Sequence, residues 1–196
     1  YMDPHDPYFE HPYDGKAIAR VTDDHPDASL APEMHRLYMG EIQYLDRNLE
    51  KLWEKLRALG LYDDTLIVVT ADHGEEFHEH GGWWHGLTLY DEQVHVPMLV
   101  KWPKGRVAGA PSVDPNLARH KDIAPTVLSL AGAPVPAAML GADLTARYAG
   151  APAPEGAHTV LAENDLEGNV LKSLRGMEWK FIEANEGNPR GLPPQQ

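Results

Sequence analysis

Two residues able to bind a metal ion stand together where an apolar segment of the chain ends. Residues 65–70 form the apolar segment, and Asp72, His73 and Gly74 follow it. A carboxylate is a hard oxygen ligand, whereas an imidazole coordinates through nitrogen or donates a hydrogen bond. Ligands of open α/β folds bind at the carboxyl ends of strands, so this position suits a divalent cation. On these residues alone, the competing interpretation is an aspartate that caps a turn beside a solvated histidine.

A longer ordered pattern surrounds this pair and extends in both directions along the chain. Its parts are Thr70–Phe77, Glu79-His80-Gly81, His85–Glu92, Val96-Pro97 and the flanking segments His5-Asp6-Pro7-Tyr8, Tyr44-Leu45-Asp46 and Asp122–Thr126. In these segments and in their order, the chain resembles the sulfatase family of the alkaline phosphatase superfamily over most of residues 1–145. The resemblance implies an enzyme that hydrolyses esters with the help of a bound cation.

The resemblance implies a metal role for the first pair of residues. Asp72 and His73 occupy the positions at which family members ligate a divalent cation, which polarises the ester oxygen. A carboxylate-dominated site favours Ca²⁺ or Mg²⁺, and Ca²⁺ is our first choice. Histidine at position 73 keeps Mn²⁺ and Zn²⁺ as alternatives, because imidazole prefers softer metals.

Two further histidines gain a catalytic, substrate-contacting interpretation from the resemblance. His85 stands where many sulfatases carry a lysine that contacts the sulfate, so this chain departs from the pattern there. His85 could bind anionic oxygens as an imidazolium, protonate the leaving group, or serve as an additional metal ligand. His5 matches the family histidine near the leaving-group oxygen, which implies a general acid. The competing interpretation of His85 is a loop histidine beside Trp83 and Trp84.

The remaining acidic and histidine side chains of this segment are expected to be ordinary loop residues. Glu75, Glu76 and Glu79 could tune the field near a cation, but exposed loop acids are the simpler interpretation. His78 and His80 lack the spacing of the His-Glu-x-x-His zinc motif, and we expect them to be solvated.

The elements that position these residues are predicted from periodicity. Pro32 to Gly60 is predicted to form an amphipathic helix, with proline in its first turn and glycine after its last. Residues 65–70 are short, apolar and rich in β-branched side chains, which predicts a buried strand in a parallel sheet. The apolar stripe of the helix comprises Tyr38, Ile42, Leu45, Leu49, Leu52 and Leu56.

Beyond a polar and aromatic loop at 72–92, the pattern alternates again. Residues 94–100 are predicted to form a strand at an edge or bulge, because Pro97 cannot donate a ladder hydrogen bond. Lys121 to Ala131 is predicted to form a helix that ends at Gly132. Toward the C-terminus, turn residues predict that three strands pair as hairpins: 158–163, 169–175 and 178–184.

This order of elements predicts an α/β fold with a small antiparallel sheet at the C-terminal end. The resemblance implies the alkaline-phosphatase-like sandwich, in which a mainly parallel sheet is flanked by helices. We therefore divide the chain into a partial sulfatase-like catalytic domain, residues 1–145, and a partial antiparallel C-terminal subdomain, residues 146–196. Both are expected to be parts of a longer protein.

Composition restricts the partners of the chain. It has 17 basic and 30 acidic residues, a formal net charge of −13, which disfavours a nucleic acid as partner. No apolar run approaches the roughly 18 residues of a membrane-spanning helix, so we expect no membrane segment in this chain. The compartment stays open between periplasmic or secreted and cytoplasmic.

The nucleophile of the family is not among these residues. Family members use a cysteine or serine in the motif Cys/Ser-x-Pro-x-Arg, and active sulfatases oxidise it to formylglycine. This chain has no cysteine, and none of its serines is followed by Pro-x-Arg. We expect the nucleophile and the other metal ligands in a missing N-terminal part of the same polypeptide, so the 196-residue chain alone should be inactive.

The predicted function is hydrolysis of a small-molecule or carbohydrate sulfate ester by the parent enzyme. A phosphoester or phosphonate hydrolase, or a phosphoethanolamine-type transferase, is the alternative that His85 keeps open within the superfamily. A non-catalytic cation-binding or interaction domain on the same scaffold is the third interpretation, because fold does not guarantee activity.

Overall fold

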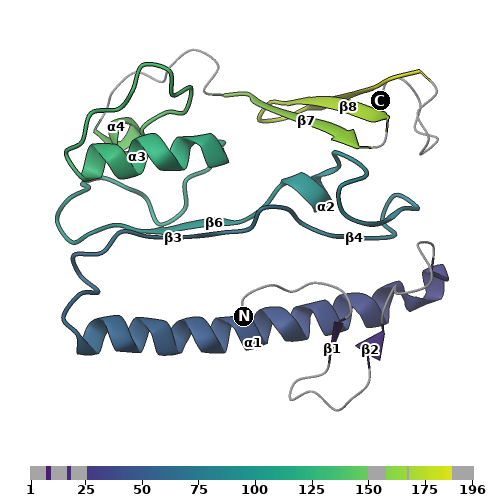
Figure 1. Ribbon diagram of the computed structural model, residues 1–196, viewed down its shortest axis with the longest axis horizontal. Helices are drawn as coiled ribbons and strands as arrows, with labels where there is room; N and C mark the ends of the chain where they lie inside the picture. Colours follow the sequence, from purple (N-terminus) through teal and green to yellow (C-terminus); the bar gives the residue numbers. More distant parts are fainter. Residues whose placement is uncertain (1–7, 10–16, 19–25, 150–157, 167, 187–196) are drawn as a thin grey trace. The chain divides into compact units, whose positions relative to one another are not determined.

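The structure is a computed structural model that describes residues 8–9, 17–18, 26–149, 158–166 and 168–186. The chain forms two compact units. The first comprises Tyr1–Asp63 with His73–His85, and the second comprises Asp64–Asp72 with Gly86–Gln196. Figure 1 shows the elements of both units along the chain.

The longest element of the first unit is helix α1 (Ala31–Ala58). It follows a 3₁₀ turn, η1 (Ala28–Leu30), whose N-cap Asp27 accepts a hydrogen bond from the backbone N–H of Ser29 at 2.8 Å. After the last turn, Gly60 adopts a φ of 69° and donates to the carbonyl of Arg57 at 3.0 Å. The helix predicted from Pro32 to Gly60 is therefore confirmed.

The core of the first unit joins the start of α1 to a short hairpin. Strand β4 (Glu76–Phe77) pairs antiparallel with strand β5 (Trp83–Trp84). Met34 and Leu37 of α1 and the aromatic residues of the hairpin form one buried cluster: Met34, Leu37, Phe77, Trp83 and Trp84. The predicted stripe is buried less than expected further along α1, where Leu52 is 46% exposed.

A second antiparallel pair in this unit joins β1 (Tyr8–Phe9) to β2 (Ala17–Ile18).

In the second unit, strand β3 (Ile67–Thr70) confirms the strand predicted at 65–70, but the predicted burial is incomplete, because its first three residues are half-buried and Thr70 is exposed. Its described partner is β6 (Met98–Lys101), which runs antiparallel to it, from Ile67 opposite Lys101 to Thr70 opposite Met98. Every strand pair among the described residues is antiparallel, so the parallel pairing expected for this strand is not seen in them. A short apolar run signals burial on both faces but does not determine the direction of the neighbouring strand.

The strand predicted at 94–100 is wrong in its first half. Asp91–Val94 forms a short helix, α2, and strand β6 begins only at Met98, directly after Pro97. Proline lacks the N–H that a ladder requires and restricts the residue before it, so the strand starts after the proline.

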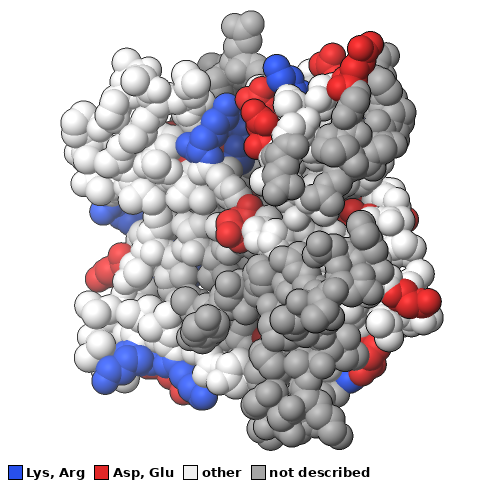
Figure 2. All heavy atoms as spheres, turned by 45° about the vertical axis from the view of Figure 1, so that its right-hand side comes forward, with Lys and Arg blue, Asp and Glu red and all other residues white. Residues whose placement is uncertain are grey.

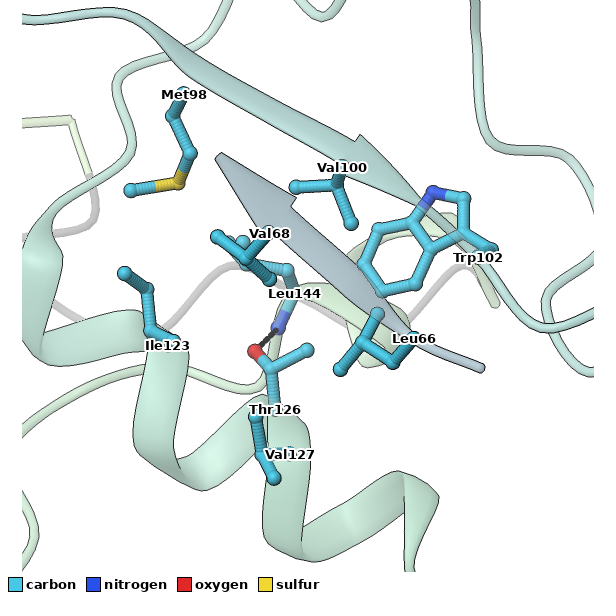
Figure 3. Close-up of a pocket in the computed structure, with 9 residues that line it drawn as sticks. All are labelled: Leu66, Val68, Met98, Val100, Trp102, Ile123, Thr126, Val127 and Leu144. Carbon is cyan, nitrogen blue, oxygen red and sulfur yellow. Dashed lines mark hydrogen bonds between the residues drawn. The ribbon is translucent and has the colours of Figure 1, made fainter. Parts of the chain in front are cut away.

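Two helices pack on the β3–β6 pair. The predicted helix at 121–131 is confirmed as the 3₁₀ turn η2 (His120–Asp122) followed by α3 (Ile123–Leu130), and α4 (Leu144–Tyr148) lies beside α3. Side chains from both strands and both helices line a small apolar cavity (Figure 3): Leu66, Val68, Met98, Val100, Trp102, Ile123, Thr126, Val127 and Leu144. The Thr126 hydroxyl accepts the backbone N–H of Leu144 at 2.9 Å, which fixes α4 against α3.

The C-terminal strands form the antiparallel sheet that was predicted. Strands β7 (Val160–Leu166), β8 (Asn169–Arg175) and β9 (Lys180–Ala184) pair in that order. One face buries Leu171 and Ala184 against Leu89. The other face carries a row of paired apolar side chains, Leu161, Leu174 and Phe181, which are 62%, 38% and 44% exposed.

Side-chain hydrogen bonds tie this sheet to the segment that follows the first unit in sequence. Asn164 donates to the carbonyl of Gly86 at 2.7 Å, and Asn169 donates to that of Leu87 at 2.8 Å. The Lys180 ammonium donates to Asp91 of α2 at 2.8 Å. The sheet therefore fixes the polypeptide just after position 85.

Charged side chains are mixed on the surface. On the face drawn in Figure 2, Lys and Arg lie in small groups near Asp and Glu, without a continuous basic area in the described part. None of the helices in the described ranges combines the length and apolar character that crossing a bilayer requires.

Candidate active site

Strand β3 ends two residues before Asp72, which belongs to the segment that resembles the family's metal site. At the end of the strand, the Thr70 hydroxyl donates to the carbonyl of Pro97 at 2.7 Å and lies 3.3 Å from Nε2 of His120. These contacts hold the strand end in place. Asp72 follows after one residue, with its side chain exposed, and chain connectivity keeps it next to His73. His5, the predicted general acid, lies outside the described residues.

The ring of His73 is oriented by its own neighbour in the chain. Its Nδ1 lies 2.8 Å from the carbonyl oxygen of Gly74. A carbonyl oxygen only accepts, so this contact requires the proton on Nδ1. Nε2 then keeps its lone pair in the neutral ring, which is the state in which histidine binds a metal.

The structure brings His85 directly against His73. The two rings stack with centroids 3.7 Å apart and planes inclined by 20°. His85 follows strand β5, whose residues Trp83 and Trp84 are only 3% and 2% exposed. The aromatic pair is therefore part of the core, and it anchors the neighbouring His85 in the chain.

Glu75 is buried, contrary to the expectation of a solvated loop acid. The residue is 8% exposed, and its Oε1 lies 3.1 Å from Nδ1 of His85. The expectation failed because a run of polar residues normally marks a surface loop, whereas here residues 75–77 are all buried. The pair contains one buried acid and one ring that is 20% exposed.

Glu76 is buried as well, at 0% exposure, and it organises the hairpin. Its Oε1 accepts the backbone N–H of Gly82 at 3.0 Å and that of His80 at 3.2 Å. A Cβ atom at position 82 would come within 2.9 Å of the same oxygen, so any larger residue there would force the Glu76 carboxylate to shift. On the other side of the turn, Glu79 accepts the N–H of Phe77 at 2.6 Å.

Two residues of the hairpin adopt backbone conformations that favour glycine. His78 has a φ of 74° and Trp84 a φ of 69°. Such conformations cost roughly 1–3 kcal/mol each and persist when surrounding contacts determine them. His78 is half-buried and stacks on Trp83 at 5.1 Å, so the expectation that it is solvated is wrong, whereas His80 is exposed as expected.

The donor types suit a divalent cation, but the described residues do not complete a metal site. Asp72 offers carboxylate oxygens and His73 offers Nε2. Within the described ranges, no group of three or more His, Cys, Asp or Glu side chains is placed to hold an ion.

The arrangement suits recognition of an anionic group. Two imidazole rings lie face to face, and each has a protein oxygen at Nδ1. Nδ1 of each ring is therefore held by a protein oxygen, and imidazole nitrogens act as lone-pair donors when neutral and as hydrogen-bond donors when charged. Sequence reasoning predicted both histidines but missed Glu75, for which the only signal was its position after Asp-His-Gly.

Comparison with known proteins agrees with the motif. A family model described as Sulfatase matches residues 1–133. An N-acetylglucosamine-6-O-sulfatase of Bacteroides thetaiotaomicron is 35% identical over 109 residues, which are 56% of this chain and 19% of that protein. The chain spans between 16% and 28% of the lengths of the curated relatives that it matches.

Solved structures show the same relationship in three dimensions. A phosphonate monoester hydrolase of Agrobacterium radiobacter aligns with a TM-score of 0.69 and 28% identity, covering 84% of this chain and 34% of that one. A protein solved in complex with D-glucosamine-2-N,6-O-disulfate aligns with a TM-score of 0.68 and 25% identity, covering 84% and 35%.

These likenesses confirm the alkaline-phosphatase-like α/β fold that the resemblance implied. The matched region contains the Asp-His-Gly segment, the hairpin and both stacked histidines. On this match and on the fold, the chain belongs to the sulfatase family.

Proposed function

We propose that the full-length protein containing this chain is a sulfuric ester hydrolase. The observation that carries the proposal is the stacked pair His73 and His85, whose ring centroids lie 3.7 Å apart, with Asp72 directly before His73 in the sequence. Family membership supports it, because the pair lies inside the region that matches sulfatases.

Each residue of the site has a role in the proposal. Asp72 and His73 hold a divalent cation, with Ca²⁺ as first choice and Mg²⁺, Mn²⁺ or Zn²⁺ as alternatives. When bound, such a cation neutralises negative charge that develops on the ester group. His85 hydrogen-bonds an oxygen of the sulfate or protonates the leaving group, and His5 acts as general acid. The nucleophile is a formylglycine-type residue outside the 196 residues.

The substrate of the proposal is a sulfate ester of a carbohydrate or of another small molecule. Two relatives support a sugar. One is named for N-acetylglucosamine-6-O-sulfate chemistry, and another was solved with a disulfated glucosamine. Sugar hydroxyl groups require hydrogen-bonding partners beyond the sulfate site, so the sugar itself is not specified by the histidine pair.

A phosphonate or phosphoester is the second candidate substrate. The alignment with a phosphonate monoester hydrolase supports it. The histidine at position 85 supports it too, because many sulfatases carry a lysine there. Both substrate classes present anionic oxygens to the same two rings.

The experiment compares turnover of aryl sulfate and aryl phosphonate esters by the purified full-length protein. For His85→Ala we expect kcat/KM for the preferred ester to fall at least about 100-fold, the scale of a lost proton donor. His80→Ala is the matched control, because its side chain is exposed in the same loop, and it should stay within about threefold of wild type. Unchanged turnover in His85→Ala would overturn the catalytic role.

A metal titration tests the cation separately. Isothermal titration of metal-free protein with Ca²⁺, Mg²⁺, Mn²⁺ and Zn²⁺ should show a site whose affinity falls strongly in Asp72→Ala. Equal affinity in both proteins would remove Asp72 as a ligand. Cation binding without turnover of either ester would support a non-catalytic domain instead.

A further inference from the structure

We propose that Glu75 is a positioning residue that fixes the ring of His85. Its carboxylate holds the imidazole in one orientation and in the tautomer with hydrogen on Nδ1. The proposal deepens the function given above and rests on the role of His85 in it. Glu75 does not touch the substrate; it acts through the histidine.

The contact that carries this inference joins a buried acid to a less buried ring. Oε1 of Glu75 lies 3.1 Å from Nδ1 of His85, within hydrogen-bonding distance. The Glu75 side chain is 3% exposed, whereas the His85 side chain is 20% exposed. The carboxylate therefore lies on the inner side of the pair, and the histidine provides the exposed part.

The direction of the hydrogen bond follows from the chemistry of the two groups. A carboxylate oxygen accepts, so the proton of this contact belongs to Nδ1. In histidine, the hydrogen bond made by one ring nitrogen decides the state of the other. Nδ1 of His85 is consequently the nitrogen that Glu75 holds, whether the ring is neutral or charged.

The same tautomer, with the proton on Nδ1, is assigned to the neighbouring ring of His73. Gly74 provides the oxygen that fixes Nδ1 of His73, and the next residue, Glu75, provides the oxygen that fixes Nδ1 of His85. Two consecutive residues thus orient two rings that stack at 3.7 Å. A 180° flip of either ring would put the carbon Cδ2 in place of Nδ1 and break one of these hydrogen bonds.

The adjacent acid shows that burial alone does not explain Glu75. Glu76 is buried more completely, and its Oε1 accepts backbone N–H groups of His80 and Gly82. Glu76 therefore stabilises the hairpin, whereas the Glu75 contact given above goes to a side chain of the candidate site. The two neighbours form a matched pair in which a structural carboxylate is the control for a positioning one.

The first test measures the tautomer in the wild-type protein and does not depend on any variant folding. Full-length metal-free protein with ¹⁵N-labelled histidine is studied by long-range ¹⁵N–¹H correlation, at a pH where the ring of His85 is neutral. The His85 signals are assigned by their loss in His85→Gln. We expect the proton on Nδ1. A neutral His85 ring protonated on Nε2 would overturn the proposal.

The second test measures the catalytic consequence. In Glu75→Gln the amide can donate to Nδ1 as well as accept from it, so we expect a mixture of tautomers. Loss of such an outer partner typically lowers activity about 10–100-fold, and we expect the loss mainly in kcat. Glu76→Gln should lower the unfolding midpoint but leave the His85 tautomer and kcat within about threefold of wild type.

A conservative variant completes the test. Glu75→Asp keeps the carboxylate on a shorter side chain, so it should restore the Nδ1–H tautomer and part of kcat relative to Glu75→Gln. Equal kcat in wild type and Glu75→Gln, or equal losses in the Gln variants of both acids, would contradict the positioning role. If His85→Ala retains full activity while the tautomer is as expected, the proposed function fails and the positioning contact stands.

Discussion

Two buried carboxylates, one in each unit, are bound by different kinds of hydrogen-bond donor. Asp122 of the second unit is 1% exposed and accepts from the backbone N–H of Arg119 at 2.9 Å and of Ala142 at 2.8 Å. The Arg119 guanidinium adds a contact of 2.9 Å. Glu75 of the first unit is 8% exposed and meets a histidine ring at 3.1 Å.

The difference lies in the donors. A guanidinium and backbone N–H groups keep their protons at every relevant pH, so Asp122 is bound to permanent donors. An imidazole changes tautomer and charge, so the donor that faces Glu75 belongs to a group able to take part in chemistry. A buried acid with permanent donors indicates stability, whereas one on a histidine at a strand end indicates a functional site.

The largest expected effect is a loss of stability when Asp122, the acid bound to permanent donors, is replaced. In Asp122→Ala the Arg119 guanidinium, whose side chain is 12% exposed, keeps its charge without this acid, and two backbone N–H groups lose their acceptor. Breaking a buried pair typically costs about 3–5 kcal/mol. Urea unfolding of the full-length protein measures the loss. A change below about 1 kcal/mol would mean that Asp122 is not the stabilising acid of this comparison.

A glycine beside Asp122 provides the next test. At Gly141 a methyl group would overlap the carbonyl oxygen of Lys121, an atom of the backbone that cannot rotate away. We expect Gly141→Ala to lower the free energy of unfolding by about 1–3 kcal/mol, as overpacking does.

Gly40→Ala is the matched control for this variant. Nothing lies within 4 Å of a Cβ at Gly40, and the residue belongs to α1. Alanine has the higher helix propensity, so stability should rise by about 0.5–1 kcal/mol. Equal effects of the two substitutions in denaturant unfolding would show that the close approach at Gly141 is unimportant.

Asp114 extends the comparison to pH. Partial burial alone would raise the pKa of its carboxyl, but hydrogen bonds from Asn116, Arg147 and Tyr148 outweigh burial and lower the pKa to about 2 from 3.8. Because the folded pKa is the lower one, its contribution, about 2 kcal/mol, is present above pH 4 and is lost as the pH falls through 2.

Unfolding by urea at pH 5 and pH 2 measures this contribution. The stability difference between wild type and Asp114→Asn should shrink by about 2 kcal/mol toward the lower pH. A difference that is the same at both pH values would show that the hydrogen bonds do not favour the ionised acid.

The smallest expected loss of stability concerns Glu76. In Glu76→Gln the side-chain oxygen still accepts from the backbone of His80 and Gly82, but the acceptor is no longer charged. The free energy of unfolding should fall by about 1 kcal/mol, the scale of one hydrogen bond. A loss of unfolding free energy as large as that of Asp122→Ala would show that Glu76 is as important for stability as Asp122.

Much of the fold was predictable because periodicity and turn residues report local structure. Helix α1, strand β3, helix α3 and the strands β7, β8 and β9 lie where the patterns predicted them. Pairing direction was less predictable, since β3 and β6 are antiparallel in the described residues. The division into 1–145 and 146–196 stays a prediction.

Which histidines belong to the site was predictable from the sequence, but the burial and backbone conformation of the surrounding residues were not. The pattern around Asp-His-Gly singled out His73 and His85, which the structure places together. It could not show that Glu75 and Glu76 are buried, because a polar run gives no signal for an inward turn. The left-handed conformations of His78 and Trp84 are also invisible in the sequence, since residue types other than glycine rarely adopt them.

The hairpin of the first unit also has a kinetic consequence. The contact between Glu75 and His85 spans ten residues, and that between Glu76 and Gly82 spans six. A loop of about ten residues closes in roughly 10–100 ns, far faster than distant strands can meet. The contacts that orient the two rings therefore lie within a short stretch of the chain, which packs on α1 through Phe77 and the two tryptophans.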